Sequence, residues 1–352
     1  MQENTTKTTN QKKKKTVVIT GASSGIGRAT ALEFARLQQA NLVLIARSEN
    51  ALRDLATQCE QVGSRTYIVT ADVTDETAMQ NAGQKAMETF GSLDVWVNNA
   101  GVTMFSRFEE TPSASFRRVI DTNLFGYVNG ARAAMPRFRE QGKGTLINIS
   151  SVAGAIAQPF SSAYSASKFA INGFSESLRM ELMDSPDIHV STVLAPSVDT
   201  PLFQHGANYT GRAVKPMDPV YTADKVARAI VAVSDNPVRE TVVGNVGRSM
   251  LMMDKVAPGM AERMMARKVS EGHFQDKPAQ ASEGNLFKPM EQCSGVSGGW
   301  KEQEEPVITR QQRVAFGLGI LGAGLGALGW MYAKGMLKFG HKKNRLTRFL
   351  GK

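Results

Sequence analysis

Short apolar runs alternate with longer amphipathic stretches along most of the chain. Helical periodicity covers residues 26–38, 51–62, 78–90, 116–139, 164–182 and 223–234, and the apolar runs lie at 17–19, 42–45, 67–69, 95–97, 145–149, 189–194 and 240–243. Runs that are apolar throughout indicate strands buried on both faces, and parallel strands need helices as connections. The pattern therefore predicts an α/β fold, a doubly wound parallel sheet of the dinucleotide-binding kind, over residues 16–250.

Three segments of different character follow this domain. Residues 251–270 are rich in methionine and predict a helical extension whose adaptable side chains pack on the domain. Residues 271–313 are polar with little periodicity, which predicts a linker. Residues 314–333 carry no charge, and twenty helical residues rise about 30 Å, the thickness of a bilayer core. We expect a transmembrane helix there, with a buried Gly-rich helix docked on the domain as the alternative.

The net charge of +10 is concentrated at the two ends of the chain. Residues 1–15 carry five lysines and one glutamate, and residues 334–352 carry seven Lys or Arg and no acidic residue. A domain that reads nucleic acid would carry its basic charge on a folded face. We therefore expect a disordered basic leader at 1–15 and a basic amphipathic tail at 334–352 that contacts a membrane surface. Nucleic-acid binding by the tails remains an alternative based on charge alone, and we expect no specific nucleic-acid partner.

The sequence also bears on location and on metals. No apolar stretch of signal-peptide length follows the first lysines, so we expect the catalytic domain to face the cytoplasm. A spanning helix at 314–333 would then place the basic tail outside, against the positive-inside tendency, so shallow insertion or a tail lying on an anionic leaflet stays open. Two cysteines and four dispersed histidines predict neither a disulfide framework nor a metal site.

A glycine-rich turn follows the first strand and opens the first helix. It reads Thr20-Gly21-Ala22-Ser23-Ser24-Gly25-Ile26-Gly27. Glycines let the backbone approach a pyrophosphate, and a helix N-terminus offers free N–H groups. Arg47 follows the second strand, where an arginine suits a 2′-phosphate and an acidic residue would suit a ribose hydroxyl. We therefore predict NADP(H) rather than NAD(H), with a solvated surface arginine as the alternative interpretation.

Polar side chains follow the later strands, at the sheet edge where ligands bind. Asp72-Val73 closes the third strand and Asn98-Asn99-Ala100-Gly101 the fourth. Tyr164 and Lys168 share one helical face, so the cation should favour the phenolate and lower the tyrosine pKa toward working pH. Ser151 lies just past a strand, where its hydroxyl can hydrogen-bond the same carbonyl oxygen that the tyrosine protonates.

The ordered set TGxxxGIG, DV, NNAG, an internal Asn, Ser and YxxxK resembles the short-chain dehydrogenase/reductase family over about residues 16–246. The resemblance implies that Tyr164 is the catalytic acid/base and that Lys168 lowers its pKa and binds the nicotinamide ribose. It implies that Ser151 polarises the substrate carbonyl and that Asn123 holds a water that relays protons through Lys168. The cofactor contacts that we expect on this basis are Thr20, Gly21, Ser23, Ser24, Gly25, Ile26, Gly27, Arg47, Asp72, Val73, Asn99, Ala100, Gly101, Tyr164, Lys168, Pro196, Val198 and Thr200.

Within this set the resemblance assigns further roles. The glycines Gly21, Gly25 and Gly27 would line the pyrophosphate, and Asp72 would contact adenine. Thr200 would hold the nicotinamide carboxamide, although Ser197 stands where the family usually has glycine. The family also implies a homo-oligomer formed through the two long helices at 116–139 and 164–182.

The segment after Thr200 would form the lid over the substrate. Its side chains and those expected opposite are apolar, which indicates a lipophilic carbonyl or secondary alcohol as substrate: Leu202, Phe203, Tyr209, Val214, Met217 and Val220 on the lid, and Met104, Phe105, Phe108, Pro159 and Phe160 opposite. The sequence thus predicts a membrane-attached NADP(H)-dependent oxidoreductase. The alternative is a non-catalytic dinucleotide sensor or scaffold, which would have no need of all four tetrad residues together.

Overall fold

The structure is a computed structural model that describes residues 14–290, 292 and 294–301. The predicted transmembrane helix at 314–333, the tail at 334–352 and nearly all of the leader lie outside the described residues. Among the described residues, no helix has the length and apolar character to cross a bilayer.

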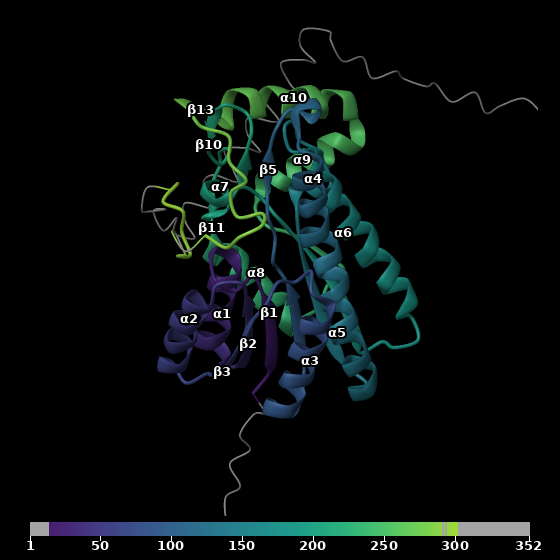
Figure 1. The fold of residues 1–352 in the computed structure, drawn as a ribbon. Coiled ribbons are helices and arrows are strands. Elements are labelled where there is room, and N and C mark those ends of the chain that lie inside the picture. Colours follow the sequence, from purple (N-terminus) through teal and green to yellow (C-terminus); the bar gives the residue numbers. More distant parts are fainter. Residues whose placement is uncertain (1–13, 291, 293, 302–352) are drawn as a thin grey trace, which may run out of the picture. The chain divides into compact units, whose positions relative to one another are not determined.

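A seven-stranded parallel sheet forms the centre of the described chain (Figure 1). Its order is β12-β7-β6-β4-β1-β2-β3, so the chain winds outward in both directions from β1. Its strands are β1 Thr16–Thr20, β2 Asn41–Ala46, β3 Arg65–Thr70, β4 Val95–Asn98, β6 Gly144–Ser151, β7 Ile188–Ala195 and β12 Glu240–Val242. The predicted doubly wound sheet is confirmed, because each apolar run of the sequence became a strand within two residues of its expected ends.

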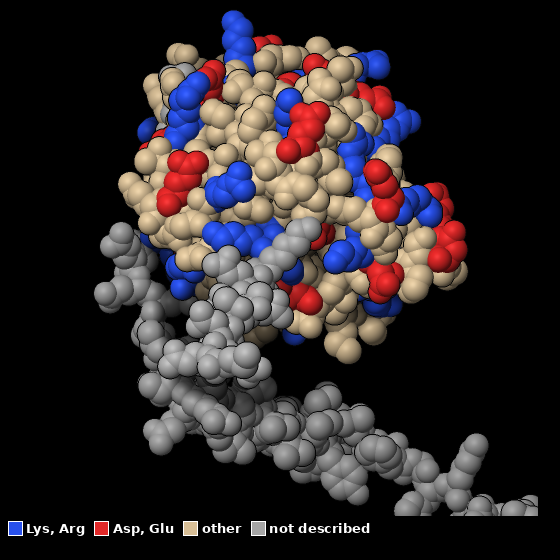
Figure 2. Space-filling model, turned by 90° about the horizontal axis from the view of Figure 1, so that it is seen from below, with Lys and Arg blue, Asp and Glu red and all other residues tan. Residues whose placement is uncertain are grey.

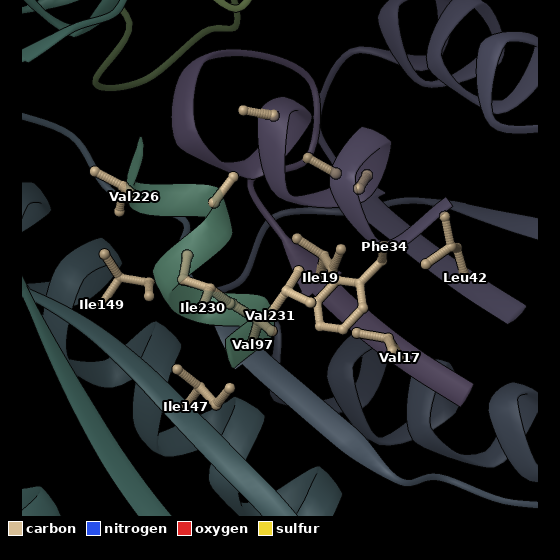
Figure 3. Close-up of a cluster of buried hydrophobic side chains, with 14 of the residues drawn as sticks. Val17, Ile19, Phe34, Leu42, Val97, Ile147, Ile149, Val226, Ile230 and Val231 are labelled. Carbon is tan, nitrogen blue, oxygen red and sulfur yellow. The ribbon is translucent and has the colours of Figure 1, made fainter. Parts of the chain in front are cut away.

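Helices cover both faces of the sheet. One face carries α1 (Gly25–Gln38), α2 (Glu49–Gln61) and α8 (Ala223–Asp235), and the other carries α3 (Glu76–Phe90), α5 (Gly126–Gln141) and α6 (Ser162–Glu181). Figure 3 shows the first face, where Phe34 of α1 and Ile230 of α8 meet Ile19 and Val97 of the sheet. These side chains are fully buried, and each contributes about 1.5–3 kcal/mol to folding.

The long helix predicted at 116–139 is divided into three parts. It comprises α4 (Ser113–Ile120), the π-helical turn η2 (Asp121–Phe125) and α5. The widened turn contains Asn123, whose amide bonds a neighbouring loop. Such π-helical turns inside α-helices are frequent at functional sites.

Short elements build the wall above the carboxyl ends of the strands. They are β5 (Met104–Phe105), η1 (Phe108–Glu110), η3 (Val152–Gly154), β8 (Val198–Asp199), α7 (Leu202–His205), β9 (Ala207–Asn208), β10 (Arg212–Val214), β11 (Tyr221–Thr222), α9 (Asn245–Val256), α10 (Pro258–Gly272) and β13 (Phe274–Pro278). Strand β5 pairs with β9, β8 with β11, and β10 with β13. The methionine-rich stretch is thus helical, in α9 and α10.

The described part of the predicted linker at 271–313 differs from our expectation. Residues Phe274–Pro278 form β13, and Leu286 is completely buried in a cluster with Val102 and Met104. Polar composition concealed this order because the segment is held mainly by backbone hydrogen bonds, which leave no hydrophobic period in the sequence. Residues 271–290, 292 and 294–301 are therefore part of the folded unit.

Charge on the folded unit is mixed in sign. Figure 2 shows one face, seen from below the view of Figure 1, with basic and acidic side chains interspersed. Several of them pair, such as Lys15 with Asp235 at 2.6 Å and Arg132 with Glu76 at 3.1 Å.

Candidate active site

One cavity extends along the carboxyl ends of the strands. It begins between Arg47 and Asp72, passes the glycine-rich turn, and ends beyond Tyr164 at His273. Most of the predicted cofactor residues line it: Gly21, Ser23, Ser24, Gly25, Ile26, Arg47, Asp72, Val73, Asn99, Ala100, Gly101, Tyr164, Lys168, Pro196, Val198 and Thr200. Two predicted residues, Thr20 and Gly27, do not.

Thr20 and Gly27 support the turn from behind. The Thr20 hydroxyl accepts hydrogen bonds from the backbone N–H groups of Asn99, at 2.9 Å, and Ala100, at 3.1 Å. A Cβ on Gly27 would lie 2.2 Å from the Gly21 carbonyl oxygen and 2.5 Å from Asn99 Nδ2. Close packing between the helix and the two loops thus surrounds both residues, and their contact with the cofactor remains a prediction.

The far end of the cavity is lined by the guanidinium of Arg47 and the carboxylate of Asp72, and a second guanidinium, that of Arg118, lies against the carboxylate. Asp72 bonds Arg118 and accepts from Thr74 Oγ1 at 2.9 Å, and Arg47 Nη1 lies 3.9 Å from it. Burial raises the pKa of Asp72, but the hydrogen bonds from Thr74 and Arg118 outweigh that effect and the pKa is lowered. The carboxylate is therefore charged, and one positive charge remains in excess at this end.

Tyr164, Lys168 and Ser151 meet at the middle of the cavity. Tyr164 and Lys168 lie one turn apart on α6, and Ser151 ends β6. Lys168 is buried and its Nζ donates to the Ile149 carbonyl oxygen at 2.9 Å. The same Nζ lies 5.6 Å from the centroid of the Tyr164 ring. Ser151 Oγ accepts a hydrogen bond from the Ala153 N–H at 3.1 Å.

Burial dominates the protonation of this cluster. It lowers the pKa of Lys168 to about 7. It also raises the pKa of Tyr164, and a hydrogen bond with Ser151 opposes that rise without cancelling it. The expected lowering of the Tyr164 pKa by Lys168 is thus not seen, because the ammonium bonds a carbonyl and is itself desolvated. In this arrangement Tyr164 carries a proton at neutral pH and can donate it.

Asn123 is fully buried and does not line the cavity. Its Oδ1 accepts from the Val102 N–H at 2.8 Å, and its Nδ2 donates to the Val102 carbonyl at 3.0 Å and to Ser167 Oγ at 3.1 Å. The amide therefore fixes the loop after β4 against α6. Its predicted water-holding role remains a prediction.

Sequence reasoning missed Tyr127 of α5. Its hydroxyl donates to the Ile149 carbonyl at 2.9 Å and lies 3.5 Å from Lys168 Nζ, so two groups share one acceptor. Burial raises the pKa of Tyr127 well above its usual value, so it remains a neutral partner. The signal available in the sequence was weak: a tyrosine one turn after Asn123 on a helix facing β6.

The near end of the cavity is mostly apolar. Of the expected substrate-lining residues, Phe105, Leu202, Phe203 and Met217 line it, whereas Tyr209, Val214, Val220, Met104, Phe108, Pro159 and Phe160 do not. Met250 of α9 and Met265 of α10 line it as well, although the methionine pattern predicted packing alone. His273 contributes a polar group, with Nδ1 bonded to the Lys215 carbonyl, and burial lowers its pKa.

The cavity fits a dinucleotide. The glycine turn lets backbone approach its contents, and the N-terminus of α1 opens onto it. Ser197 and Thr122 also line it, and the side-chain oxygen of each is buried without a hydrogen-bond partner in the described structure. These residues would bind the cofactor along the groove from Arg47 to Thr200.

Known proteins resemble this chain in sequence and in fold. The short chain dehydrogenase family matches residues 15–208. An uncharacterized oxidoreductase of Bacillus subtilis, YxnA, is 33% identical over 270 residues, which are 76% of each chain. The structure of an alcohol dehydrogenase from Thermococcus sibiricus, complexed with 5-hydroxy-NADP, superposes with a TM-score of 0.57 at 28% identity and covers 65% of this chain and 95% of that one. A short chain dehydrogenase/reductase from Burkholderia phymatum in complex with NAD has a TM-score of 0.63 at 23% identity over 71% of this chain and 95% of that one, which supports the fold alone.

Proposed function

Because the chain belongs to the short-chain dehydrogenase/reductase family and is an oxidoreductase of that family, we propose that it reduces a lipophilic carbonyl compound with NADPH, or oxidises the corresponding secondary alcohol. The observation that carries the proposal is the meeting of Ser151, Tyr164 and Lys168 in one cavity with the glycine-rich turn. A dinucleotide sensor would have no use for a buried hydroxyl, phenol and ammonium at this point.

Each residue of the site has its own role in the proposed reaction. When bound, the nicotinamide supplies or accepts the hydride. Ser151 Oγ donates a hydrogen bond to the substrate carbonyl oxygen, and Tyr164 donates its proton to the same oxygen as negative charge develops there. Lys168, with a pKa of about 7, can return a proton toward Tyr164, while Tyr127 and the Ile149 carbonyl hold its ammonium in place. Water relayed past Asn123 is the proposed outer source of that proton.

The preference for NADPH is supported by the charges at the adenosine end. Arg47 and Arg118 face the single carboxylate of Asp72 there, so a 2′-phosphate would meet a net positive charge. We expect Arg47→Ala to raise the KM for NADPH about tenfold or more while changing the KM for NADH less than twofold. A wild-type enzyme that prefers NADH, or a preference that survives in Arg47→Ala, contradicts this assignment.

The substrate class follows from the apolar near end of the cavity, where Phe105, Phe203, Met250 and Met265 lie. A panel of long-chain, cyclic and small polar carbonyls, with NADPH oxidation followed at constant cofactor concentration, tests it. We expect kcat/KM to rise with the apolar surface of the substrate. Efficient turnover of small sugars alone would overturn the proposed substrate class.

Membrane attachment through residues 314–333 and 334–352, a catalytic domain facing the cytoplasm, and a homo-oligomer remain predictions. Protease accessibility of the full chain in sealed vesicles tests the first two. We expect the folded unit to be digested from the cytoplasmic side and the full chain to stay with the vesicles in high salt.

A further inference from the structure

Residues 282–290 and 294–301, here called the strap, lie across the proposed cofactor groove and bind both of its rims. At the adenosine end, Arg47 donates to the carbonyl oxygens of Leu286, at 3.1 Å, and Asn285, at 2.6 Å, and Arg118 Nε donates to Leu286 at 2.8 Å. In Figure 1 the yellow end of the described chain runs beside α7 and β11.

The strap also binds the middle and the opposite rim of the groove. The backbone N–H of Gly25, the first residue of α1, donates to the Gly295 carbonyl at 3.0 Å. Asp199 accepts hydrogen bonds from the N–H groups of Gly298, at 3.0 Å, and Trp300, at 2.9 Å, and from the Ser297 hydroxyl. The strap is thus bound to the adenosine end, the glycine turn and the segment that precedes Thr200.

Close backbone contact explains why the strap is rich in glycine. A Cβ on Gly284, whose φ is +52°, would lie 2.2 Å from the His205 carbonyl oxygen, and one on Gly298 would lie 2.4 Å from the Thr200 carbonyl oxygen. Trp300 closes this rim, with Nε1 donating to the Thr200 carbonyl at 3.2 Å and to Gln204 Oε1 at 3.1 Å. Leu286 anchors the strap in the cluster with Val102 and Met104, whereas the contacts of residues 294–301 named above are hydrogen bonds. This second part of the strap can therefore separate from the groove without unfolding the core.

The groove stays hollow beneath the strap. The cavity is lined there by Ser23, Ser24 and Ile26 from the turn and by Asn285 from the strap. Asn285 Oδ1 is buried and has no hydrogen-bond partner in the described structure. A buried amide oxygen without a partner is destabilising, and the amino and hydroxyl groups of an adenosine are donors that would satisfy it.

We propose that the strap closes over the bound dinucleotide, that Asn285 contacts its adenosine half, and that the strap must open before the cofactor can enter or leave. The inference rests on the proposed function only in requiring that a nicotinamide dinucleotide occupies this groove. A closed strap slows both association and release, since each passes through the open state. Exchange of the cofactor then limits turnover on rapidly reduced substrates.

The test is the exchange of NADPH with the full chain, measured by stopped-flow fluorescence. Trp300→Ala removes two hydrogen bonds from the strap rim, and we expect it to raise both the association and the dissociation rate constants about tenfold. Phe287→Ala is the matched control, because Phe287 is an exposed aromatic residue of the strap, and it should leave both rate constants within twofold. Asn285→Ala should raise the dissociation rate constant alone.

Hydrogen exchange distinguishes a strap that closes over the bound cofactor from a strap that blocks the cofactor's place in the groove. The backbone N–H groups of Asn285, Gly298 and Trp300 are bonded to the groove rims, and NADPH should slow their exchange if the strap closes over it. Faster exchange with NADPH would mean that the cofactor displaces the strap and would overturn the proposal, as would unchanged rate constants in Trp300→Ala. If the wild-type chain binds neither NADPH nor NADH, the proposed function fails as well, so the two failures are distinguishable.

Discussion

The buried ammonium of Lys168 makes the stability of the protein depend on pH in a defined direction. Burial lowers its pKa from the usual 10.5 to about 7, whereas the unfolded chain keeps the usual value. Between these two values the unfolded state binds more protons than the folded state, so the free energy of unfolding rises with pH. The destabilisation is fully present below pH 7, where it is about 5 kcal/mol, and it disappears above pH 10.5.

The perturbation that isolates this effect is Lys168→Met, which keeps an unbranched side chain one atom shorter and removes the charge. From pH 7 to pH 9 the wild type should gain about 2 kcal/mol relative to the variant, because over these two pH units the unfolded state keeps the lysine proton whereas the folded state loses it. Urea unfolding at the two pH values measures the free energy of unfolding of both proteins. The titration of all other groups cancels when the wild type is compared with the variant. Lys143→Met, at an exposed lysine before β6, is the control and should show no such change. A difference in the free energy of unfolding between wild type and Lys168→Met that is the same at pH 7 and pH 9 would refute the reasoning.

Two further substitutions test the supporting geometry. Gly27→Ala should destabilise the protein by about 1–3 kcal/mol in urea unfolding, because its Cβ would lie 2.2 Å from the Gly21 carbonyl oxygen. The control is Gly173→Ala in α6, where nothing lies within 4 Å of the added Cβ, and it should be neutral or slightly stabilising. Equal changes in the free energy of unfolding for the two variants would contradict the packing argument. Asp72→Asn should lower the free energy of unfolding at pH 7. The difference between wild type and variant should disappear as the pH falls through the lowered pKa of Asp72. A gap that persists at pH 2 would show that the carboxylate charge is not the cause.

The fold could be predicted from the sequence because each buried strand is a continuous apolar run. The runs at 42–45 and 145–149, for example, became β2 and β6. Their helices repeat apolar side chains at helical spacing, and a parallel sheet covered on both faces is the arrangement that buries all of them. The order of the motifs along the chain then predicted that Ser151, Tyr164 and Lys168 meet at the carboxyl ends of the strands.

What the sequence did not reveal depends on contacts between distant segments. Tyr127 joins the Lys168 cluster only because α5 and α6 both face β6. Leu286 is a single apolar residue in a polar stretch, and its burial depends on the surface formed by residues near Val102 and Val119. Backbone carbonyls that bind Arg47 have no signature in the residue types that carry them.

The exposed apolar residues Met252, Val256 and Met260 on α9 and α10 also show the limit of periodicity. The pattern of methionines predicted helices, but it could not show which side chains line the cavity and which face solvent. Met250 and Met265 line the cavity because α9 and α10 contact each other across its near end.

The central claim is that Tyr164 donates the proton in a reaction at this site, and one comparison tests it most directly. Turnover of an apolar ketone with NADPH should fall by a factor of about 10²–10⁴ in Tyr164→Phe, with NADPH affinity unchanged within a few-fold. Tyr67→Phe, on β3 away from the cavity, should keep full activity. Retained turnover in Tyr164→Phe would contradict the account, and so would tight NADPH binding by the wild type with no turnover of any carbonyl or alcohol, which would favour a dinucleotide sensor.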